Sequence, residues 1–594
     1  ILGLRSAAAS ANRASPIYIA PRELGAPRGI ETGYRPSNRF PEPWPGGWWR
    51  IGDIISYELA TARSLLGSLA RERRHWLEGA LETAERAIAE AGGDAAPQGW
   101  LIPPDNRDRG ALRRLLGILL AEGIDIEAAA EAFDADEMRY PAGTLILRRD
   151  QPYGGFLKDL FEVQRYPDGP SPYDVAGWTL PLLLGVRRVE VVRPFAVRGE
   201  EVRSAEEALA RLPAPARPAH PWTRLDGDDS DSLRGVIGLL EAAIPVVFDG
   251  REDSPGPGAW AIPDDPDDPR RLDRARAIIG DGDRGRILEG TEPLRDPAAR
   301  VDEGGGAEAA EEQGEEVEEA EEEKEGENAT AGARELVRLD RLPRVGLYAP
   351  WVASMDEGWT RWVLEAFGLP YRRLRNESIR AGNLRSIVDV LIVPSVPASI
   401  VKAGRSEGSI FPRFAGGLDP EGSVAIEEFV RAGGTLIAFD RACDFVIELF
   451  ALTLENAAAG GRDEKSFRCP GSILRTVPVE GTALTAGLPP SQPVFFSGSR
   501  AFRPKEAKGK EAKSKRSAER ARALKLEPLL RFPESRILLS GWIRKPEAIA
   551  GTTAWGRVKI GKGFVHLFGF RPQYRSWSQV SFRLLFRAIL MPDS

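Results

Sequence analysis

Apolar residues recur at helical spacing early in the chain and in short strand-like runs further on. Between residues 51 and 91, leucines and alanines repeat every three or four positions, which predicts a helical segment with a break near residues 71–74. The pair Gly92-Gly93 ends that segment. Before it, residues 16–20 form an apolar run that predicts a strand, and the proline-rich stretch at 22–46 excludes a helix.

Residues 96–299 contain alternating strand and helix patterns that predict a middle α/β region. A strand end is predicted at residues 100–103 and another strand at 144–147, after a turn. The helix between them is predicted to run from Asp105, as its N-cap, to Glu122, with Gly123 as its stop.

A second set of similar patterns follows within the same region. A helix is predicted at 233–242 and a strand at 245–248, and residues 259–263 resemble residues 99–103. This weak likeness raises the hypothesis of an internal duplication.

Two charged, low-complexity stretches separate the folded patterns. Residues 300–333 are rich in glutamate with almost nothing to bury, so we expect a disordered linker. Residues 503–525 are rich in Lys, Arg, Ala and Glu without an apolar stripe, which predicts a solvated insertion. We expect limited proteolysis to cut these two stretches first.

Residues 334–594 give the clearest α/β signal. Buried strands alternate with helices, which is typical of a doubly wound parallel sheet. The strands are predicted at 345–348, 388–393, 435–439, 537–539, 556–560 and 564–568, and the helices at 356–367, at 424–432, from about 443, and at 580–591. The fold class is therefore α/β and multidomain.

The composition of the chain limits the kinds of function that it can have. The net charge of −7 argues against nucleic acid binding, and no apolar run is long enough to span a membrane. No signal-peptide pattern follows Ile1, and the sequence assigns no compartment. With two cysteines and three histidines in 594 residues, a thiolate zinc site or a disulfide framework is not expected.

One short motif matches a zinc-binding pattern literally. His75 and Glu78 are spaced as His-x-x-Glu and would share a helix face. The neighbouring Arg71 to Arg74 stretch would repel a cation, and His220 lies in a proline-rich loop. Because a zinc site needs at least three clustered ligands, we predict no metal site in this chain.

Several long, Trp-rich stretches together resemble one known arrangement. They lie at residues 43–50, 149–153, 172–180, 351–361 and 567–573. They are similar to the C-terminal part of a bacterial branch of M14 zinc carboxypeptidase-like proteins, which ends in a class I glutamine amidotransferase-like domain. The resemblance implies that residues 1–95 are the residual tail of a peptidase-like domain and that 334–594 is the amidotransferase-like domain.

The resemblance transfers no catalytic residue. In the family, zinc is held by a His-x-x-Glu pair and a later His, with another Glu as general base, and these positions lie before or around Ile1. Residues 4–12 resemble the place of that Glu, yet no acidic residue occurs before Glu23. The resemblance therefore implies a non-catalytic accessory or binding region, without a cofactor, or alternatively part of an active carboxypeptidase whose zinc domain lies upstream.

A third alternative is a thiol enzyme that uses Cys443. This residue follows a buried strand and opens a helix, where amidotransferases place their nucleophile, and a helix N-terminus lowers a thiol pKa. Against it, Cys443 lacks flanking glycines, Asp444 opposes thiolate formation, and the only histidine in the domain, His566, lies in an apolar strand.

A ligand site is predicted at the carboxyl ends of the parallel strands. Loops and helix N-termini meet there, so we expect Trp351, Asp356, Asp440, Cys443 and Arg571 to lie around one crevice. An aromatic face, two carboxylates and a guanidinium would suit a peptide or amino-acid-like ligand. The alternative is that the carboxylates only cap helices and pair with the arginine.

Overall fold

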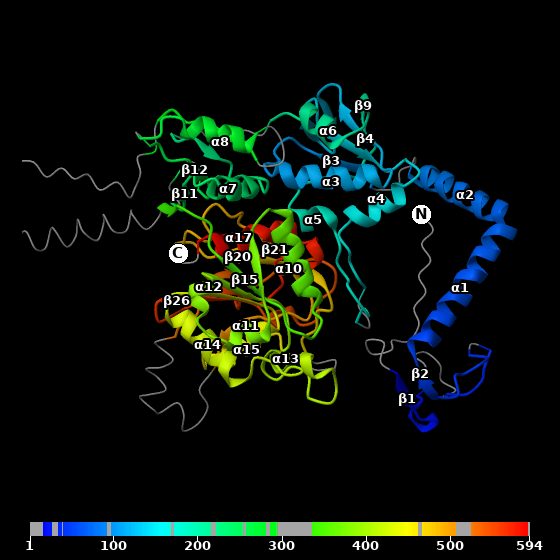
Figure 1. The fold of residues 1–594 in the computed structure, drawn as a ribbon. Helices are drawn as coiled ribbons and strands as arrows, with labels where there is room; N and C mark the ends of the chain where they lie inside the picture. The colour runs from blue at the N-terminus through cyan, green and yellow to red at the C-terminus, as the bar shows by residue number, and fades with distance from the viewer. Residues whose placement is uncertain are drawn as a thin grey trace, which may run out of the picture. The chain divides into compact units, whose positions relative to one another are not determined.

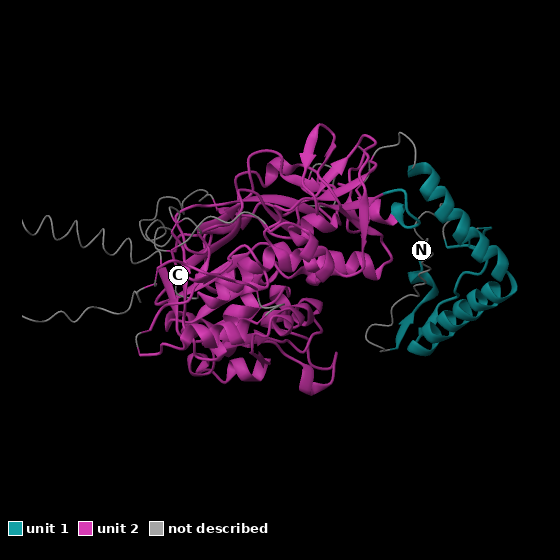
Figure 2. Ribbon diagram, turned by 90° about the horizontal axis from the view of Figure 1, so that it is seen from above, with its two compact units in different colours: residues 1–95, 149–155 teal, residues 96–148, 156–594 magenta. Residues whose placement is uncertain are grey.

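The computed structural model describes residues 16–25, 34–38, 40–91, 97–167, 171–214, 221–251, 254, 257–265, 267–280, 285–292, 294, 336–460, 466–505 and 524–591. The acidic stretch at 300–333 lies outside the described residues, as do His220 and most of the insertion at 503–525. Contacts divide the chain into two compact units, residues 1–95 with 149–155 and residues 96–148 with 156–594 (Figure 2). None of the described helices is long and apolar enough to span a bilayer.

The first unit consists of a two-stranded antiparallel ribbon and two long helices. Its elements are β1 (Ile17–Ile19), η2 (Pro21–Glu23), β2 (Gly47–Trp49), α1 (Ile51–Arg71) and α2 (Arg73–Ala91) (Figure 1). The predicted break is confirmed at Glu72, whose backbone leaves helical geometry at the end of α1. Asp53 fixes the start of α1 by accepting a hydrogen bond from the Arg50 N–H at 2.8 Å.

The second unit begins with a five-stranded sheet in the order β8-β3-β7-β4-β9, with all neighbours antiparallel. Its elements are β3 (Gly99–Ile102), α3 (Arg109–Ala121), β4 (Ile126–Ala129), β5 (Phe133–Ala135), β6 (Met138–Tyr140), β7 (Leu145–Arg148), α4 (Gly154–Phe161), α5 (Leu180–Leu184), β8 (Val189–Val191), β9 (Gly199–Val202) and α6 (Ala205–Arg211). Trp100, Leu115 and Leu119 pack in the core between this sheet and its helices.

The start of α3 corrects one prediction. The N-cap is Asp108, whose carboxylate accepts the Ala111 N–H at 2.8 Å, and not Asp105, which forms an ion pair with Arg187. The segment before Asp108 is held in a loop, because the Asn106 amide donates to the carbonyls of Pro103 and Arg187.

A second five-stranded sheet follows in the order β13-β10-β12-β11-β14, again with antiparallel neighbours. Its elements are β10 (Arg224–Leu225), α7 (Ser232–Glu241), β11 (Val246–Asp249), β12 (Trp260–Ala261), α8 (Arg271–Ile279), β13 (Ile287–Leu288) and β14 (Leu336–Leu339). The strand β14 completes this sheet, although the sequence pattern grouped it with the C-terminal domain.

The two sheets share one topology, which supports the duplication hypothesis. In chain order β3, β4, β7, β8 and β9 correspond to β10, β11, β12, β13 and β14, and α3 corresponds to α7. The likeness noted in the sequence is wrong in its register, because residues 259–263 contain β12, the counterpart of β7 rather than of β3. We call the described residues of the two halves repeat 1 (97–148 and 156–214) and repeat 2 (221–339).

The C-terminal domain is built on a larger mixed sheet. Strands β16-β15-β17-β18-β26 are parallel, and the sheet continues through β25, β23, β20 and β21 with antiparallel pairing. The strands are β15 (Val345–Tyr348), β16 (Tyr371–Leu374), β17 (Val390–Val393), β18 (Thr435–Phe439), β19 (Leu454–Asn456), β20 (Ser472–Pro478), β21 (Gln492–Phe496), β22 (Phe502–Pro504), β23 (Glu527–Arg531), β24 (Leu538–Ser540), β25 (Thr553–Ile560) and β26 (Gly563–Phe568).

Both faces of the parallel strands are buried under helices. Leu347, Ile392 and Ile437 pack with α10 and α17, whereas Leu391 and Leu436 pack with α11, α14 and α15 (Figure 1). The helices are α10 (Met355–Ala366), α11 (Asn376–Arg380), α12 (Leu384–Ile387), α13 (Ala398–Lys402), η3 (Pro412–Phe414), α14 (Asp419–Arg431), α15 (Ala442–Leu449), η5 (Pro546–Ala548), η6 (Tyr574–Ser576), η7 (Gln579–Ser581) and α17 (Phe582–Leu590). The α/β, multidomain class is confirmed, and among the described strands the parallel pairs are those of β16-β15-β17-β18-β26.

Candidate functional site

Polar side chains gather where the parallel strands of the C-terminal domain end. Strands β15, β17, β18 and β26 run in the same direction, so their carboxyl ends meet at one edge of the sheet. Ser395 follows β17, Asp440 follows β18, and Arg571 follows β26 by three residues. Ser354 after β15 caps α10 by accepting the Glu357 N–H at 3.2 Å, which fixes Asp356 in the first turn.

Arg571 lies between two carboxylates from different strand ends. Its Nη1 is 3.5 Å from Asp356 Oδ2, and its Nε is 3.6 Å from Asp440 Oδ2. Its Nη2 donates to the Ser497 carbonyl at 3.0 Å, and the guanidinium lies 4.6 Å from the Tyr574 ring centroid. The sequence prediction that these three side chains converge therefore agrees with the structure.

A second arginine completes the group. Arg500 Nη1 donates to Asp440 Oδ1 at 3.1 Å, and its Nε donates to Asp444 Oδ1 at 3.2 Å. We call Asp356, Asp440, Asp444, Arg500 and Arg571 the edge cluster. Three carboxylates face two guanidinium groups within it, and the charge of Arg441 also acts on Asp356 and Asp440.

Asp440 occupies a strained turn between β18 and α15. Its φ of 48° lies in the left-handed region, which non-glycine residues seldom adopt. Ser395 Oγ donates to its Oδ2 at 2.8 Å, so that a serine hydroxyl, Arg500 and Arg571 all face one carboxylate. The turn from β18 to α15 thus places the Asp440 carboxylate, and not the Cys443 thiol, at the edge of the sheet.

Burial sets the electrostatics of the two central carboxylates. Desolvation raises the pKa of Asp356 and of Asp440, and the neighbouring Arg571 counteracts this rise in both. The Asp440 side chain is 3% exposed, whereas Asp356 and Arg571 retain 14% and 16%. Both carboxylates face Arg571 at distances longer than an ordinary hydrogen bond, whereas Asp440 also binds Arg500 at 3.1 Å.

Cys443 does not line this edge. Its side chain is fully buried, and its S–H faces the carbonyls of Ala438 at 3.4 Å and Phe568 at 3.3 Å. Burial, followed by the Asp440 charge, raises the pKa of the thiol well above its usual range. The expectation that Cys443 shares the crevice is therefore wrong, because the first turn of α15 directs the sulfur into the core.

Trp351 belongs to a neighbouring group of contacts. Its Nε1 donates to Glu377 Oε1 at 2.9 Å, its ring packs on Phe414 at 4.9 Å between centroids, and Arg375 lies over it at 4.2 Å. These contacts hold the loop after β15 against η3, and among the described residues Trp351 makes no hydrogen bond to the edge cluster.

Sequence reasoning missed three residues of this arrangement, Ser395, Asp444 and Arg500. Ser395 directly follows the Val393-Pro394 strand end, so the rule that selected Asp440 could also have found it. Arg500 lies beyond β21, in a turn with no helical or strand pattern. Its backbone N–H donates to the Gly569 carbonyl at 2.6 Å, a long-range contact that no local signal predicts.

The described residues do not fit a zinc ion. No group of three or more His, Cys, Asp or Glu side chains in the described part of the chain is arranged to hold a metal. Glu78 of the His-x-x-Glu motif is paired with Arg74 at 2.6 Å. His566 is fully buried in β26 beside Arg557, and desolvation lowers its pKa to about 3.

Comparisons with known proteins assign no family. No family model matches the chain, and no curated protein matches it. Among solved structures, a β-galactosidase from Bacillus circulans sp. alkalophilus has 13% identity and a TM-score of 0.23 over 41% of this chain and 30% of its own. An exo-β-1,4-mannosidase from Opitutaceae bacterium strain TAV5 has 13% identity and a TM-score of 0.23 over 45% and 38%.

A cytoplasmic protein from Salmonella typhimurium has 12% identity and a TM-score of 0.27 over 42% of this chain and 99% of its own. In contrast, the present chain spans only 30% and 38% of the two glycosidases, well under half of their length. At these TM-scores the likenesses carry no argument about fold family or function.

Proposed function

We propose that this chain is a non-catalytic accessory region of an M14 zinc carboxypeptidase-like protein, and that its edge cluster binds a small peptide or amino-acid-like ligand. The proposal joins the sequence resemblance at residues 43–50, 149–153, 172–180, 351–361 and 567–573 to the geometry of the C-terminal domain. The amidotransferase-like nature of that domain is part of the same proposal.

The observation that carries the proposal is the position of Arg571 between Asp356 and Asp440. Its two ion-pair distances of 3.5 and 3.6 Å exceed the usual 2.7–3.2 Å for a hydrogen bond, so neither carboxylate holds the guanidinium tightly. A ligand carboxylate suits the guanidinium fork, and a ligand amine suits the carboxylates, whose charged form is disfavoured by burial and favoured by nearby cations.

Binding without turnover fits the chemistry of the cluster better than catalysis does. A thiol nucleophile needs access and a lowered pKa, and Cys443 has neither. The active-carboxypeptidase alternative requires a zinc domain outside the described residues, and no feature of the edge cluster favours it over simple binding.

Isothermal titration calorimetry on the full chain tests the proposal. The probes are L-alanyl-L-alanine, which carries both charges, and its C-terminal amide, which lacks the carboxylate. We expect the dipeptide to bind and the amide to bind at least about tenfold more weakly, which corresponds to roughly 1.4 kcal/mol of lost carboxylate–guanidinium contact.

Two variants and a control assign the binding to the cluster. Arg571→Lys keeps the charge but removes the fork, and Asp356→Asn removes an acceptor charge, so each should weaken dipeptide binding about tenfold or more. Arg372→Lys, an exposed change on β16, should leave it unaltered. Equal binding of dipeptide and amide, or equal binding by all variants, would refute the proposed site.

A further inference from the structure

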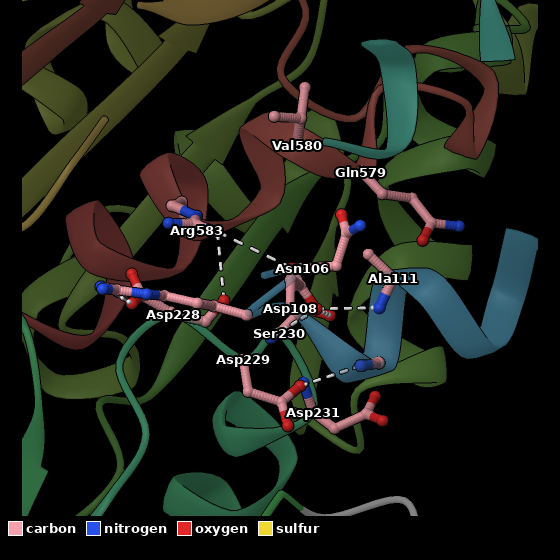
Figure 3. Close-up of polar contacts among 12 residues, drawn as sticks. Asn106, Asp108, Ala111, Asp228, Asp229, Ser230, Asp231, Gln579, Val580 and Arg583 are labelled. Atoms are coloured by element: carbon pink, nitrogen blue, oxygen red, sulfur yellow. Dashed lines mark hydrogen bonds and ion pairs between the residues drawn. The ribbon is translucent and has the colours of Figure 1, made fainter. Parts of the chain in front are cut away.

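The two repeats meet through the N-termini of α3 and α7. Asp108 Oδ1 accepts the Ser230 N–H at 3.1 Å and the Ser230 hydroxyl at 2.8 Å, while Asp229 Oδ1 accepts the Gly110 N–H at 3.0 Å (Figure 3). Asp229 of repeat 2 thus accepts an N–H from the first turn of α3, and Asp108 of repeat 1 binds Ser230, two residues before α7 begins. The reciprocal contacts hold the repeats in a defined arrangement.

We call this junction between the N-termini of α3 and α7 the seam. The C-terminal domain also contacts it. Arg583 of α17 lies 3.7 Å from Asp108 Oδ2 and donates to the Asp228 carbonyl at 3.4 Å (Figure 3). Gln579, just before α17, accepts a hydrogen bond from Arg114 of α3. Repeat 1, repeat 2 and the C-terminal domain therefore all contribute contacts that hold the seam in place.

A cavity of about 980 Å³ lies beside the seam, with walls from both repeats. Repeat 1 contributes Arg109 and Arg113 from α3, residues 209 and 210 of α6, and residues 212–214 after it. Repeat 2 contributes Asp226 and Asp229 ahead of α7, the end of α8, and β13 with its flanks. This volume is at the upper end of those typical for small-molecule sites.

Positive charge dominates the polar part of the wall. The described lining has four arginines, at 109, 113, 276 and 286, against three acids, Asp226, Asp229 and Glu289. Burial, with the charges of Asp108 and Asp231 beside it, raises the pKa of Asp229 to about 7, so that near neutral pH this acid is charged only in part. Counted over the described lining alone, the formal charge is therefore one to two positive. Within it, Arg113 pairs with Asp231, and Arg276 pairs with Asp273 and Glu289.

The rest of the wall is apolar. Leu209 and Leu212 of repeat 1 face the same space as Ile279, Ile287 and Leu288 of repeat 2. An apolar surface with a net positive polar rim complements an anion carried on a hydrocarbon body.

We propose that the cavity between the repeats binds a small organic anion with an apolar body. The guanidinium groups, which reach the cavity from both repeats, take the anionic head, and the leucine and isoleucine side chains cover the apolar part. This site is separate from the edge cluster. Unlike the ligand proposed for the edge cluster, its ligand needs no cationic group.

Competition fluorescence on the full chain tests the proposal. The probe is 8-anilinonaphthalene-1-sulfonate, and the competitors are hexanoate, hexanol and hexylammonium, which share a chain and differ in charge. We expect the probe to bind with enhanced fluorescence, hexanoate to displace it, and hexylammonium to require at least about a tenfold higher concentration.

Substitutions in the cavity wall test whether hexanoate binds in this cavity. Arg286→Glu reverses an exposed charge on the wall, and Ala210→Trp places a large ring at the end of α6 that reaches the cavity. Each should weaken hexanoate binding about tenfold or more, whereas the matched charge reversal Arg372→Glu on β16 should not. Arg571→Lys should leave hexanoate binding intact, which separates this site from the edge cluster.

Three outcomes overturn the proposal. They are displacement by hexylammonium as readily as by hexanoate, unchanged binding in both Arg286→Glu and Ala210→Trp, and absence of saturable probe binding to the folded chain. Because Arg286 lies on the surface, its variant keeps the test decisive even if the Ala210→Trp protein fails to fold.

Discussion

At the residue scale, two residues that were candidates for catalysis, His566 and Cys443, are fully buried in the core. His566 lies in β26 with its ring 6.0 Å from that of Trp555, and neither ring nitrogen has a hydrogen-bond partner within the described residues. A polar ring buried without partners destabilises the fold. The apolar strand pattern around His566 agrees with its burial in the structure.

His566 should make stability depend on pH. Its folded pKa of about 3 lies below the ordinary value of 6.5, so the unfolded chain takes up a proton first as the pH falls. The free energy of unfolding should therefore drop between pH 6.5 and 3, by up to about 1.4 kcal/mol per pH unit from this group. Urea unfolding of His566→Leu should lack this part of the slope and show higher stability at pH 5.

The exposed His75 provides the control for that measurement. His75→Gln, on the surface of α2, should unfold like the parent chain at each pH. A His566→Leu protein with the same pH slope as the parent would contradict the buried, neutral state of His566.

Cys443 should be chemically inert in the folded chain. Because the thiolate is the reactive form, a buried thiol with a raised pKa should resist alkylation. We expect iodoacetamide at pH 8 to leave Cys443 unmodified in native protein and to modify it after unfolding, as judged by mass spectrometry of the peptide. Rapid native alkylation of Cys443 would revive the thiol-enzyme alternative.

At the scale of elements, the seam between α3 and α7 depends on the protonation of one acid. Asp229 has a folded pKa of about 7, raised by burial and by Asp108 and Asp231, against about 3.9 when unfolded. The folded state therefore holds a proton that the unfolded chain releases, and stability should fall as the pH rises from about 4 to 7.

Asp229→Asn should remove that dependence, because the amide oxygen can still accept the Gly110 N–H without carrying charge. The variant should gain stability relative to the parent above pH 7, measured by urea unfolding at pH 5 and 8. Asp273→Asn, an exposed change on α8, is the matched control. A variant that loses stability equally at both pH values would show that the Asp229 charge is not strained.

The sequence predicted elements best where the apolar pattern was continuous. The buried runs at β15 and β18 and the long helices α1 and α2 agree closely with the structure. Short strands such as β4 and β9 were missed, because three or four residues with alternating or acidic character give little periodic signal. The start of α3 was misplaced because Asp105 and Asp108 are equivalent capping residues by sequence alone.

The candidate site was predictable only in part. The strand-end rule selected Asp356, Asp440 and Arg571, which the structure brings together. It also selected Cys443, and no local pattern indicates which way the first turn of α15 directs its side chain. Arg500 reaches Asp440 across 60 residues of chain, a contact that depends on the antiparallel half of the sheet.

At the scale of the whole molecule, repeat 1, repeat 2 and the C-terminal domain form one unit. Ser540 of β24 donates to Gln164 Oε1 at 2.8 Å, and Arg583 of α17 reaches Asp108 in repeat 1. The cavity lies beside the junction of the two repeats, whereas the edge cluster lies at the ends of the parallel strands. The two sites should therefore respond to different ligands.

The purified chain should carry well under one zinc ion per molecule, since a tight site needs three or four clustered ligands. Metal analysis after exposure to zinc and gel filtration measures this directly. His75→Ala should retain the same trace amount as the parent chain. One tightly held zinc per chain, lost in His75→Ala, would contradict the prediction.

The most direct measurement of the central claim is a crystal structure of the full chain soaked with L-alanyl-L-alanine. The account predicts intact dipeptide at the edge cluster, with its carboxylate on Arg571 and its amine facing Asp356 or Asp440. Cleaved dipeptide, a covalent adduct at Cys443, or an unoccupied edge cluster in crystals of a chain that binds the dipeptide in solution would contradict it.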